Sequence, residues 1–167
     1  MLFTKKYTYV LAFLMSFFLS ACVSNIESAN NNFMKEKLSS VSVTAPTEHL
    51  ELLFFQQFNQ ITQNNASNSN FELQYSLNIS NTQALAFTGN SSNLKNTSLT
   101  IDFVLIDKQT EKIVHKGTIT SQATSGAVSG IYAQEQSAKF AQERLALVLA
   151  ERVYQDLYLY FLETIDS

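Results

Sequence analysis

The stretch at residues 71–79, FELQYSLNI, alternates apolar and polar side chains at every position. Successive side chains of a β-strand point to opposite faces, so the apolar and polar residues fall on opposite faces. The apolar set is Phe71, Leu73, Tyr75, Leu77 and Ile79, and the polar set is Glu72, Gln74, Ser76 and Asn78. The pattern predicts a half-exposed strand of an antiparallel sheet, with the apolar set facing the core because a slip of one residue would turn it to solvent.

Further strands are indicated on either side of this one. The apolar face of residues 98–107, SLTIDFVLID, would consist of Leu99, Ile101, Phe103 and Leu105. The turn-forming DKQTEK leads into IVHKGTITSQA, so a β-hairpin is predicted, although the face assignment of the return strand is ambiguous around Gly117. A short alternating piece, VSV at 41–43, predicts another strand.

Two segments predict helices. Thr47, after Pro46, is the predicted N-cap of EHLELLFFQQFNQI, and Glu48 and Glu51 lie in its first turn. A longer helix is predicted at about residues 132–162. The apolar stripes, at spacings of three and four, are Leu50, Leu53, Phe54, Phe58 and Ile61 in the first helix and Ala138, Ala141, Leu145, Leu149, Val153, Leu157 and Phe161 in the second.

In chain order these elements run β-α-β-β-β-α. The order predicts an α+β fold, in which a four-stranded, mainly antiparallel sheet carries two helices packed on one face. A single domain at residues 39–167 accommodates all of them and is long enough for one real core. Residues 22–38 are polar, Asn-rich and without periodicity, so they are predicted to form a flexible tether.

The N-terminus has the organisation of a bacterial secretion signal. A lysine pair precedes an apolar run at residues 7–19, which leads through small residues into Cys22, the one cysteine of the chain. The run is shorter than the roughly 20 apolar residues that a membrane helix needs. The sequence LSAC at 19–22 resembles the bacterial lipobox, so residues 1–21 are interpreted as a lipoprotein signal peptide and Cys22 as the lipidation site. The alternatives are an ordinary secretory signal with an incidental cysteine and an uncleaved anchor helix.

A lipid on Cys22 would determine where the protein resides. Two or more acyl chains hold a protein stably on a bilayer, and this covalent lipid is the one prosthetic group we expect. Val23 rather than an aspartate follows the cysteine, which favours the outer membrane, with the body facing the periplasm. With a single cysteine, no disulfide can form within the chain. The balance of 11 basic against 14 acidic residues argues against a nucleic-acid partner.

Nothing in the sequence points to an enzyme. His49 at a helix start and His115 in a strand are interpreted as solvated or hydrogen-bonded structural residues. No GxSxG, HExxH or CxxC motif occurs, and the chain has only 4 glycines from which to build a phosphate-binding loop. No catalytic residue and no metal site is therefore predicted.

From about Val41 to Phe161 the chain resembles the lipopolysaccharide-assembly lipoprotein family, LptE, in its alphaproteobacterial form. The resemblance lies in FELQYSLNIS followed by QALAFTGNSS, in the hairpin SLTIDFVLIDKQTEKIVHKGTIT, and most closely in SGIYAQEQSAKFAQERLALVLAERVYQDLYLYF. One departure is that VSNIESANNN, after the cysteine, lacks the Pro-Leu-Tyr segment that many members carry there.

The resemblance implies a role without chemistry. Such lipoproteins sit inside the large outer-membrane barrel LptD, plug it, help it fold, and contact lipopolysaccharide on its way to the cell surface. Family members contact lipopolysaccharide through basic residues on strand ends and adjoining loops. The candidates in this chain are Lys95, Lys112 and Lys116, with simple solvated lysines as the alternative.

Two pairs of residues are candidates for facing a protein partner. Gln74 and Asn78 lie on the polar face of the predicted sheet, while Tyr154 and Tyr158 have amphipathic rings suited to a wet interface. The alternative for the tyrosines is a helix end that covers the sheet and the other helix. Two rival functions stay open: an accessory lipoprotein of another envelope lipid transporter, and a lipoprotein activator of a peptidoglycan synthase.

Overall fold

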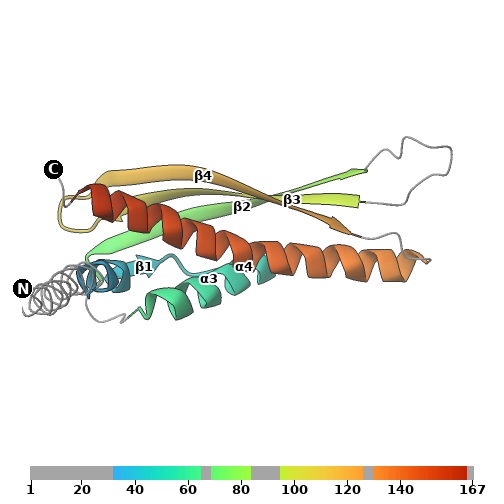
Figure 1. The fold of residues 1–167 in the computed structure, drawn as a ribbon, viewed down its shortest axis with the longest axis horizontal. Helices are drawn as coiled ribbons and strands as arrows, with labels where there is room; N and C mark the ends of the chain where they lie inside the picture. Colours follow the sequence, from blue (N-terminus) through green and yellow to red (C-terminus); the bar gives the residue numbers. More distant parts are fainter. Residues whose placement is uncertain (1–31, 65–68, 84–94, 126–129, 165–167) are drawn as a thin grey trace, which may run out of the picture. The chain divides into compact units, whose positions relative to one another are not determined.

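A computed structural model describes residues 32–64, 69–83, 95–125 and 130–164 of the 167-residue chain. The chain divides into two units, Met1–Glu36 and Lys37–Ser167. The second unit contains the sheet and its two helices, and its elements are drawn in Figure 1. They are β1 (Val41–Val43), α3 (His49–Thr62), β2 (Phe71–Gln83), β3 (Lys95–Asp107), β4 (Lys112–Ser125) and α4 (Ile131–Glu163). This order confirms the predicted β-α-β-β-β-α arrangement.

The four strands form one mixed sheet in the order β1-β2-β3-β4. β1 runs parallel to β2 because α3 connects them as a crossover, whereas β2, β3 and β4 are antiparallel neighbours joined directly along the chain. The β2–β3 ladder is continuous from Phe71, opposite Asp107, to Gln83, opposite Lys95. The β3–β4 ladder has one irregularity: Leu105 faces His115, while its neighbour Ile106 faces Ile113. Val114 is thereby left without an opposite residue.

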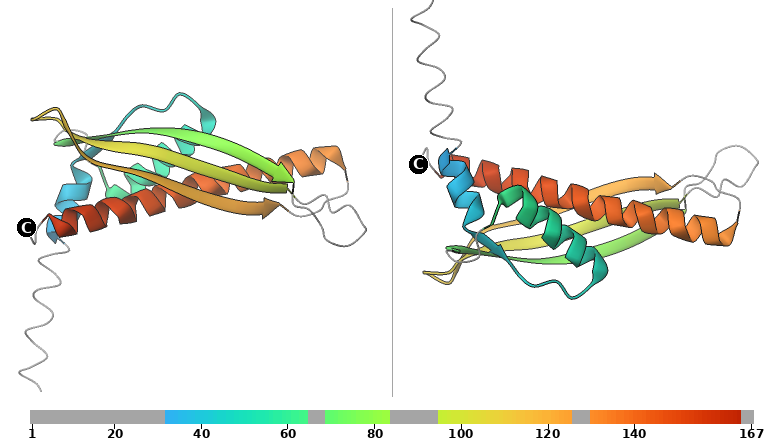
Figure 2. Two further views of the ribbon diagram at one scale, coloured as in Figure 1. Left: turned by 90° about the horizontal axis from the view of Figure 1, so that it is seen from above. Right: turned by 90° about the horizontal axis from the view of Figure 1, so that it is seen from below.

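Both helices pack on one face of the sheet, as the sequence predicts (Figures 1 and 2). The inner face of β3 supplies much of the core, because its four predicted apolar residues are buried, as is Leu73 of β2. Tyr75 and Leu77 are half-buried, and the Tyr75 hydroxyl donates to the Glu51 carbonyl of α3 over 3.3 Å. Burial there raises the pKa of Tyr75 to about 12. Ile79 lies on the same face but is 45% exposed.

The structure corrects the predicted start of α3. Its N-cap is Glu48 rather than Thr47, and a capping box joins Glu48 and Glu51. The Glu51 carboxylate accepts from the backbone N–H and the hydroxyl of Thr47, each over 2.8 Å. These hydrogen bonds, the Thr47 N–H foremost, hold the pKa of Glu51 below its ordinary value. The buried face of α3 centres on Phe54, Phe58 and Thr62.

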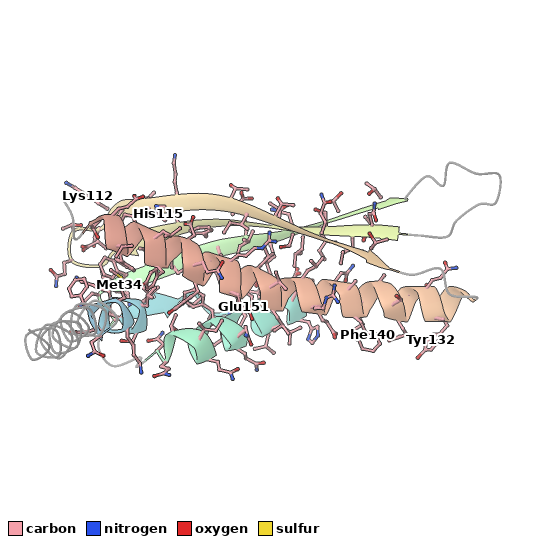
Figure 3. All side chains as sticks on the ribbon, in the orientation of Figure 1. Met34, Lys112, His115, Tyr132, Phe140 and Glu151 are labelled. Carbon is pink, nitrogen blue, oxygen red and sulfur yellow. The ribbon has the colours of Figure 1, made fainter. Side chains whose placement is uncertain are left out.

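The long helix α4 confirms its prediction over residues 145–161. Leu145, Leu149, Val153, Leu157 and Phe161 are buried, together with two alanines, Ala146 and Ala150, that the predicted stripe omitted. Ala138 and Ala141, predicted as close contacts, are only half-buried. The first turns instead present Tyr132 and Phe140 to solvent (Figure 3). Within the described residues, none of the helices combines the length and apolar character that crossing a bilayer requires.

Residues 32–39 form a short helix, whereas the sequence predicts a flexible tether as far as residue 38. Leu38 is fully buried, and the Lys37 ammonium lies over the Phe71 ring, 5.8 Å from its centroid. Ser40 ends the helix by donating its hydroxyl to the Lys37 carbonyl over 2.7 Å. The folded unit therefore begins before residue 39, where the sequence placed its boundary.

Candidate functional site

The outer face of the sheet, away from the helices, is a regular array of polar side chains. The register aligns these residues in rows across β2, β3 and β4: Gln74, Val104 and Lys116; Ser76, Asp102 and Thr118; Asn78, Thr100 and Thr120. We call these three rows the outer polar face. Gln74 and Asn78, predicted to face a partner, and Lys116, predicted to contact lipopolysaccharide, lie together on it.

Cross-strand hydrogen bonds hold the outer polar face in place. Asp102, at its centre, accepts from the Thr118 hydroxyl over 2.6 Å and from the Asn78 amide over 3.4 Å. Thr100 and Thr120 share a hydrogen bond of 2.9 Å in the next row. Such pairs stabilise a sheet and leave the remaining lone pairs and N–H groups directed at solvent. The array thus presents hydrogen-bonding groups at spacings set by the sheet rather than by mobile loops.

A shallow, open depression of about 680 Å³ lies on this face. The first two rows line it, together with the strand positions between them, Tyr75, Phe103 and Gly117. The side chains of Tyr75 and Phe103 belong to the inner face, so these positions contribute mainly backbone to the floor. On the inner side the Phe103 ring lies directly against Gly117: a Cβ there would be 2.6 Å from its Cζ. A side chain at this position would therefore force the Phe103 ring to move.

The charge of the depression is mixed. Lys116 is the one cation in its lining, and Asp102 is the one carboxylate. A phosphate usually requires several cations or backbone N–H groups, whereas hydroxyl and amide groups suit a surface of Gln, Ser, Thr and Asp side chains. The depression is therefore better matched to neutral polar groups, such as those of a protein surface or a sugar, than to a phosphate.

Towards the hairpin end, the outer face carries two apolar side chains beside Glu72. Ile106 and Ile113 face each other on it, and Ile113 is 60% exposed. The irregularity at Val114 causes this, because it reverses the in–out alternation of β4 between Ile113 and His115. The sequence left the faces of this strand ambiguous, and nothing in the alternation alone would have located the irregularity.

The three predicted lipopolysaccharide-contacting lysines do not form a cluster. Lys112 lies opposite Asp107 at the hairpin end of the sheet (Figure 3), while Lys95 lies opposite Ser125 at the other end. At about 3.4 Å per residue, the length of β3 separates these two positions by roughly 40 Å. The side chain of Lys95 lies outside the described residues. Lys116 alone reaches the outer polar face.

Tyr154 and Tyr158 form a second, separate surface. Both lie on α4, in the helical layer that covers the opposite face of the sheet, and their ring centroids are 6.5 Å apart. With Gln155 and the exposed Leu159 they border an open hollow of about 430 Å³. The four residues predicted to face a partner are thus divided between two surfaces.

Both histidines have acidic partners. His49 contacts Glu143 over 3.1 Å and joins the start of α3 to α4. The His115 Nε2 lies 2.6 Å from an Asp156 carboxylate oxygen, and its ring stacks on Tyr160 with centroids 4.7 Å apart. Among the residues that the structure describes, no three His, Cys, Asp or Glu side chains converge to hold a metal ion. Cys22 lies outside the described residues.

The mixed sheet with its helices on one face defines an α+β class that recurs among solved bacterial lipoproteins. A candidate lipoprotein from Caulobacter crescentus shares the fold with a TM-score of 0.63 and 22% identity, over 78% of this chain and 96% of that one. The rare lipoprotein B from Shewanella oneidensis matches with a TM-score of 0.58 and 12% identity, over 74% of this chain and 96% of that one. A minor lipoprotein from Acinetobacter baumannii matches with a TM-score of 0.53 and 17% identity, over 71% of this chain and 90% of that one. No family model matches the sequence, and no curated protein matches it.

Proposed function

We propose that this chain is a lipid-anchored outer-membrane lipoprotein that assists assembly of the lipopolysaccharide-translocating barrel LptD, plugs it, and helps deliver lipopolysaccharide to the cell surface. The N-terminal signal that ends at Cys22 supports the anchor. The fold shared with lipoproteins of other bacteria supports a role in the same kind of envelope. The resemblance of residues 41–161 to the LptE family supports the particular partner.

The outer polar face is the observation that carries the proposal. The lumen of an outer-membrane barrel is polar, so a plug must present a polar surface to it. Asp102, hydrogen-bonded to Thr118 and Asn78, lies at the centre of such a surface. Because cross-strand contacts already order these side chains, binding to matching groups would cost little further side-chain conformational entropy.

Delivery of lipopolysaccharide needs a contact with its phosphates or its sugars. Lys116 beside the neutral polar groups of the depression suits a sugar hydroxyl together with one anionic group. Lys112, exposed at the hairpin end, would supply a separate contact. Lys116→Ala should therefore reduce lipopolysaccharide binding by the purified protein more than Lys108→Ala, which changes an exposed lysine of the hairpin turn bound to Ser69.

Site-specific photo-crosslinking tests the plug. A crosslinker at Gln74 or Asn78 should capture a barrel of large mass, whereas one at exposed Glu151 on α4 (Figure 3) serves as the matched control. Depletion of the protein should lower the amount of correctly folded barrel and make cells leaky to large apolar antibiotics. Peptidoglycan synthesis rates should at first stay unchanged. Absence of any capture from the outer polar face would contradict the plug.

The surface of Tyr154 and Tyr158 favours a second candidate. Half-buried aromatic rings beside the exposed Leu159 are typical of protein interfaces, and they lie on the helical layer rather than on the outer polar face. Capture of a transporter subunit or a peptidoglycan synthase from Tyr154 or Tyr158, with nothing captured from Gln74, would identify the chain as an accessory lipoprotein of another lipid transporter or as a synthase activator.

A further inference from the structure

The two long edges of the sheet differ in how far other parts of the chain cover their backbone groups. On the β2 side, β1 covers only Phe71–Leu73, and the last backbone contact there runs from the Thr44 N–H to the Leu73 carbonyl over 3.0 Å. Among the residues that the structure describes, none pairs with β2 on this side from Gln74 to Gln83. Figure 2 shows β2, in bright green, running along this rim of the sheet.

The backbone geometry shows which groups this edge presents. The Phe71 N–H donates to the Ser40 carbonyl and the Leu73 carbonyl accepts from Thr44, so these alternate residues direct their backbone groups away from β3. Because a strand repeats every two residues, the positions that follow at the same parity do the same. They are Tyr75, Leu77, Ile79, Asn81 and Gln83. These positions form a continuous row of donors and acceptors, which we call the open edge.

The β4 edge, by contrast, is protected. The Arg152 guanidinium of α4 donates to the Thr120 carbonyl over 3.0 Å and so occupies an edge acceptor. β4 also carries Lys112, Lys116 and the irregularity at Val114. Side-chain cover, lysines and irregularities are the devices by which proteins prevent pairing at an edge strand. In the part of the chain that the structure describes, residues 74–83 have none of them: they contain no charge and no proline, and their register with β3 is unbroken.

We propose that the open edge pairs antiparallel with the open edge of a second copy of this chain. The edge runs from Tyr75 to Gln83 with its midpoint at Ile79, so a two-fold axis there would let both copies pair over its whole length. The two Ile79 side chains, now 45% exposed, would lie side by side on the inner face. On the outer face, small polar groups would meet, such as Asn78 and Ser80.

A second copy of the chain offers an open edge of the same length that is likewise free of charge and proline. With no charged residue between positions 74 and 83, antiparallel pairing of two copies opposes no like charges. A partner strand of opposite charge gains nothing at this edge for the same reason. This pairing goes beyond the proposed function, because it concerns the chain outside a barrel, whereas the proposed plug is the chain within one.

Disulfide trapping of the full chain in mild detergent tests the pairing. In a Cys22→Ser background, Ile79→Cys would be the sole thiol, and the paired positions would have Cα atoms about 5.5 Å apart, within the range of a disulfide. Mild oxidation should convert Ile79→Cys to a covalent dimer. The matched control is Ile113→Cys, which replaces a more exposed isoleucine on the other edge strand and should remain largely uncrosslinked. Equal crosslinking of the two variants would overturn the proposal.

The molar mass in solution provides a second, independent readout. The Cys22→Ser chain should have the mass of two copies by light scattering, and Ile79→Lys, which opposes two ammonium groups across the axis, should have the mass of one. Ile113→Lys should keep the two-copy mass. A chain that is single at all accessible concentrations, or one whose Ile79→Cys thiol crosslinks only to another protein in envelope extracts, would refute pairing with a second copy. Circular dichroism should show the same secondary structure in both lysine variants.

Discussion

The contact between Gly117 and the Phe103 ring makes the substitution Gly117→Ala informative. A Cβ at residue 117 would lie 2.6 Å from Cζ and 2.8 Å from Cε1 of Phe103. Ordinary carbon–carbon contacts lie at about 3.5–4.0 Å, so the ring would have to move by roughly 1 Å. Phe103 is only 2% exposed, and the packed core around it opposes such a shift.

Two effects of opposite sign decide the magnitude. Overpacking of a core costs about 1–3 kcal/mol, and the short distances here favour the upper part of that range. Replacing glycine by alanine within a strand contributes about 0.5–1 kcal/mol in the other direction, because alanine loses less backbone entropy on folding. We therefore expect Gly117→Ala to lower the free energy of unfolding by about 1–2 kcal/mol.

Urea unfolding followed by far-UV circular dichroism measures this change in the chain from residue 22 onward with Cys22→Ser. Phe103→Ala should by itself cost about 3–5 kcal/mol through the cavity that it leaves. In that background the obstacle to a Cβ is gone, so adding Gly117→Ala should be neutral or stabilising. If Gly117→Ala has the same effect in both backgrounds, within about 0.5 kcal/mol, the argument from the Phe103 ring is wrong.

Cys22→Ser should abolish metabolic labelling with palmitate and leave the precursor unprocessed; labelling that persists would remove the lipoprotein interpretation. Leu73→Ala should cost about 2–5 kcal/mol in urea unfolding, whereas Ile79→Ala, at an exposed inner position, should cost under about 1 kcal/mol. Glu51→Ala should cost about 1 kcal/mol at neutral pH. Hydrogen bonds from Thr47 lower the pKa of Glu51, so the stabilisation by Glu51 is fully present above the ordinary pKa of 4.5 and is lost as pH falls through the depressed pKa. Urea unfolding of both proteins between pH 7 and about pH 3 measures this loss. A difference in unfolding free energy between Glu51→Ala and the unaltered chain that does not change with pH would show that the reasoning is wrong.

The sequence predicted the elements whose side-chain periodicity is unbroken. The alternation of residues 71–79 gave the faces of β2, and the stripe from Leu145 to Phe161 gave the buried side of α4. The helix at 32–39 was missed because its composition is mostly polar, and periodicity is hard to detect over so few residues. The N-cap was predicted one residue too early, because Thr47 and Glu48 are both possible N-cap residues. The Glu51 side chain, which completes the capping box with Glu48, decides between them.

The candidate site was less predictable than the fold. Gln74 and Asn78 followed from alternation, and the register then placed Lys116 and Asp102 beside them. That cross-strand alignment depends on where the irregularity at Val114 falls, which one strand's sequence does not reveal. For the same reason, the exposure of Ile113 could be read only from the paired strands.

The small size of β1 has a mechanical consequence. Only Val41–Val43 attach this strand to β2, and it is the strand nearest to Cys22 along the chain. If Cys22 carries the proposed lipid, a load between that lipid and the folded body would enter the sheet at its shortest ladder, whereas β2, β3 and β4 are held together along their whole length. We expect pulling from the N-terminus to detach β1 at a low force and leave the three-stranded remainder intact. β1 would then detach first when the envelope is deformed, and the outer polar face on β2, β3 and β4 would stay folded.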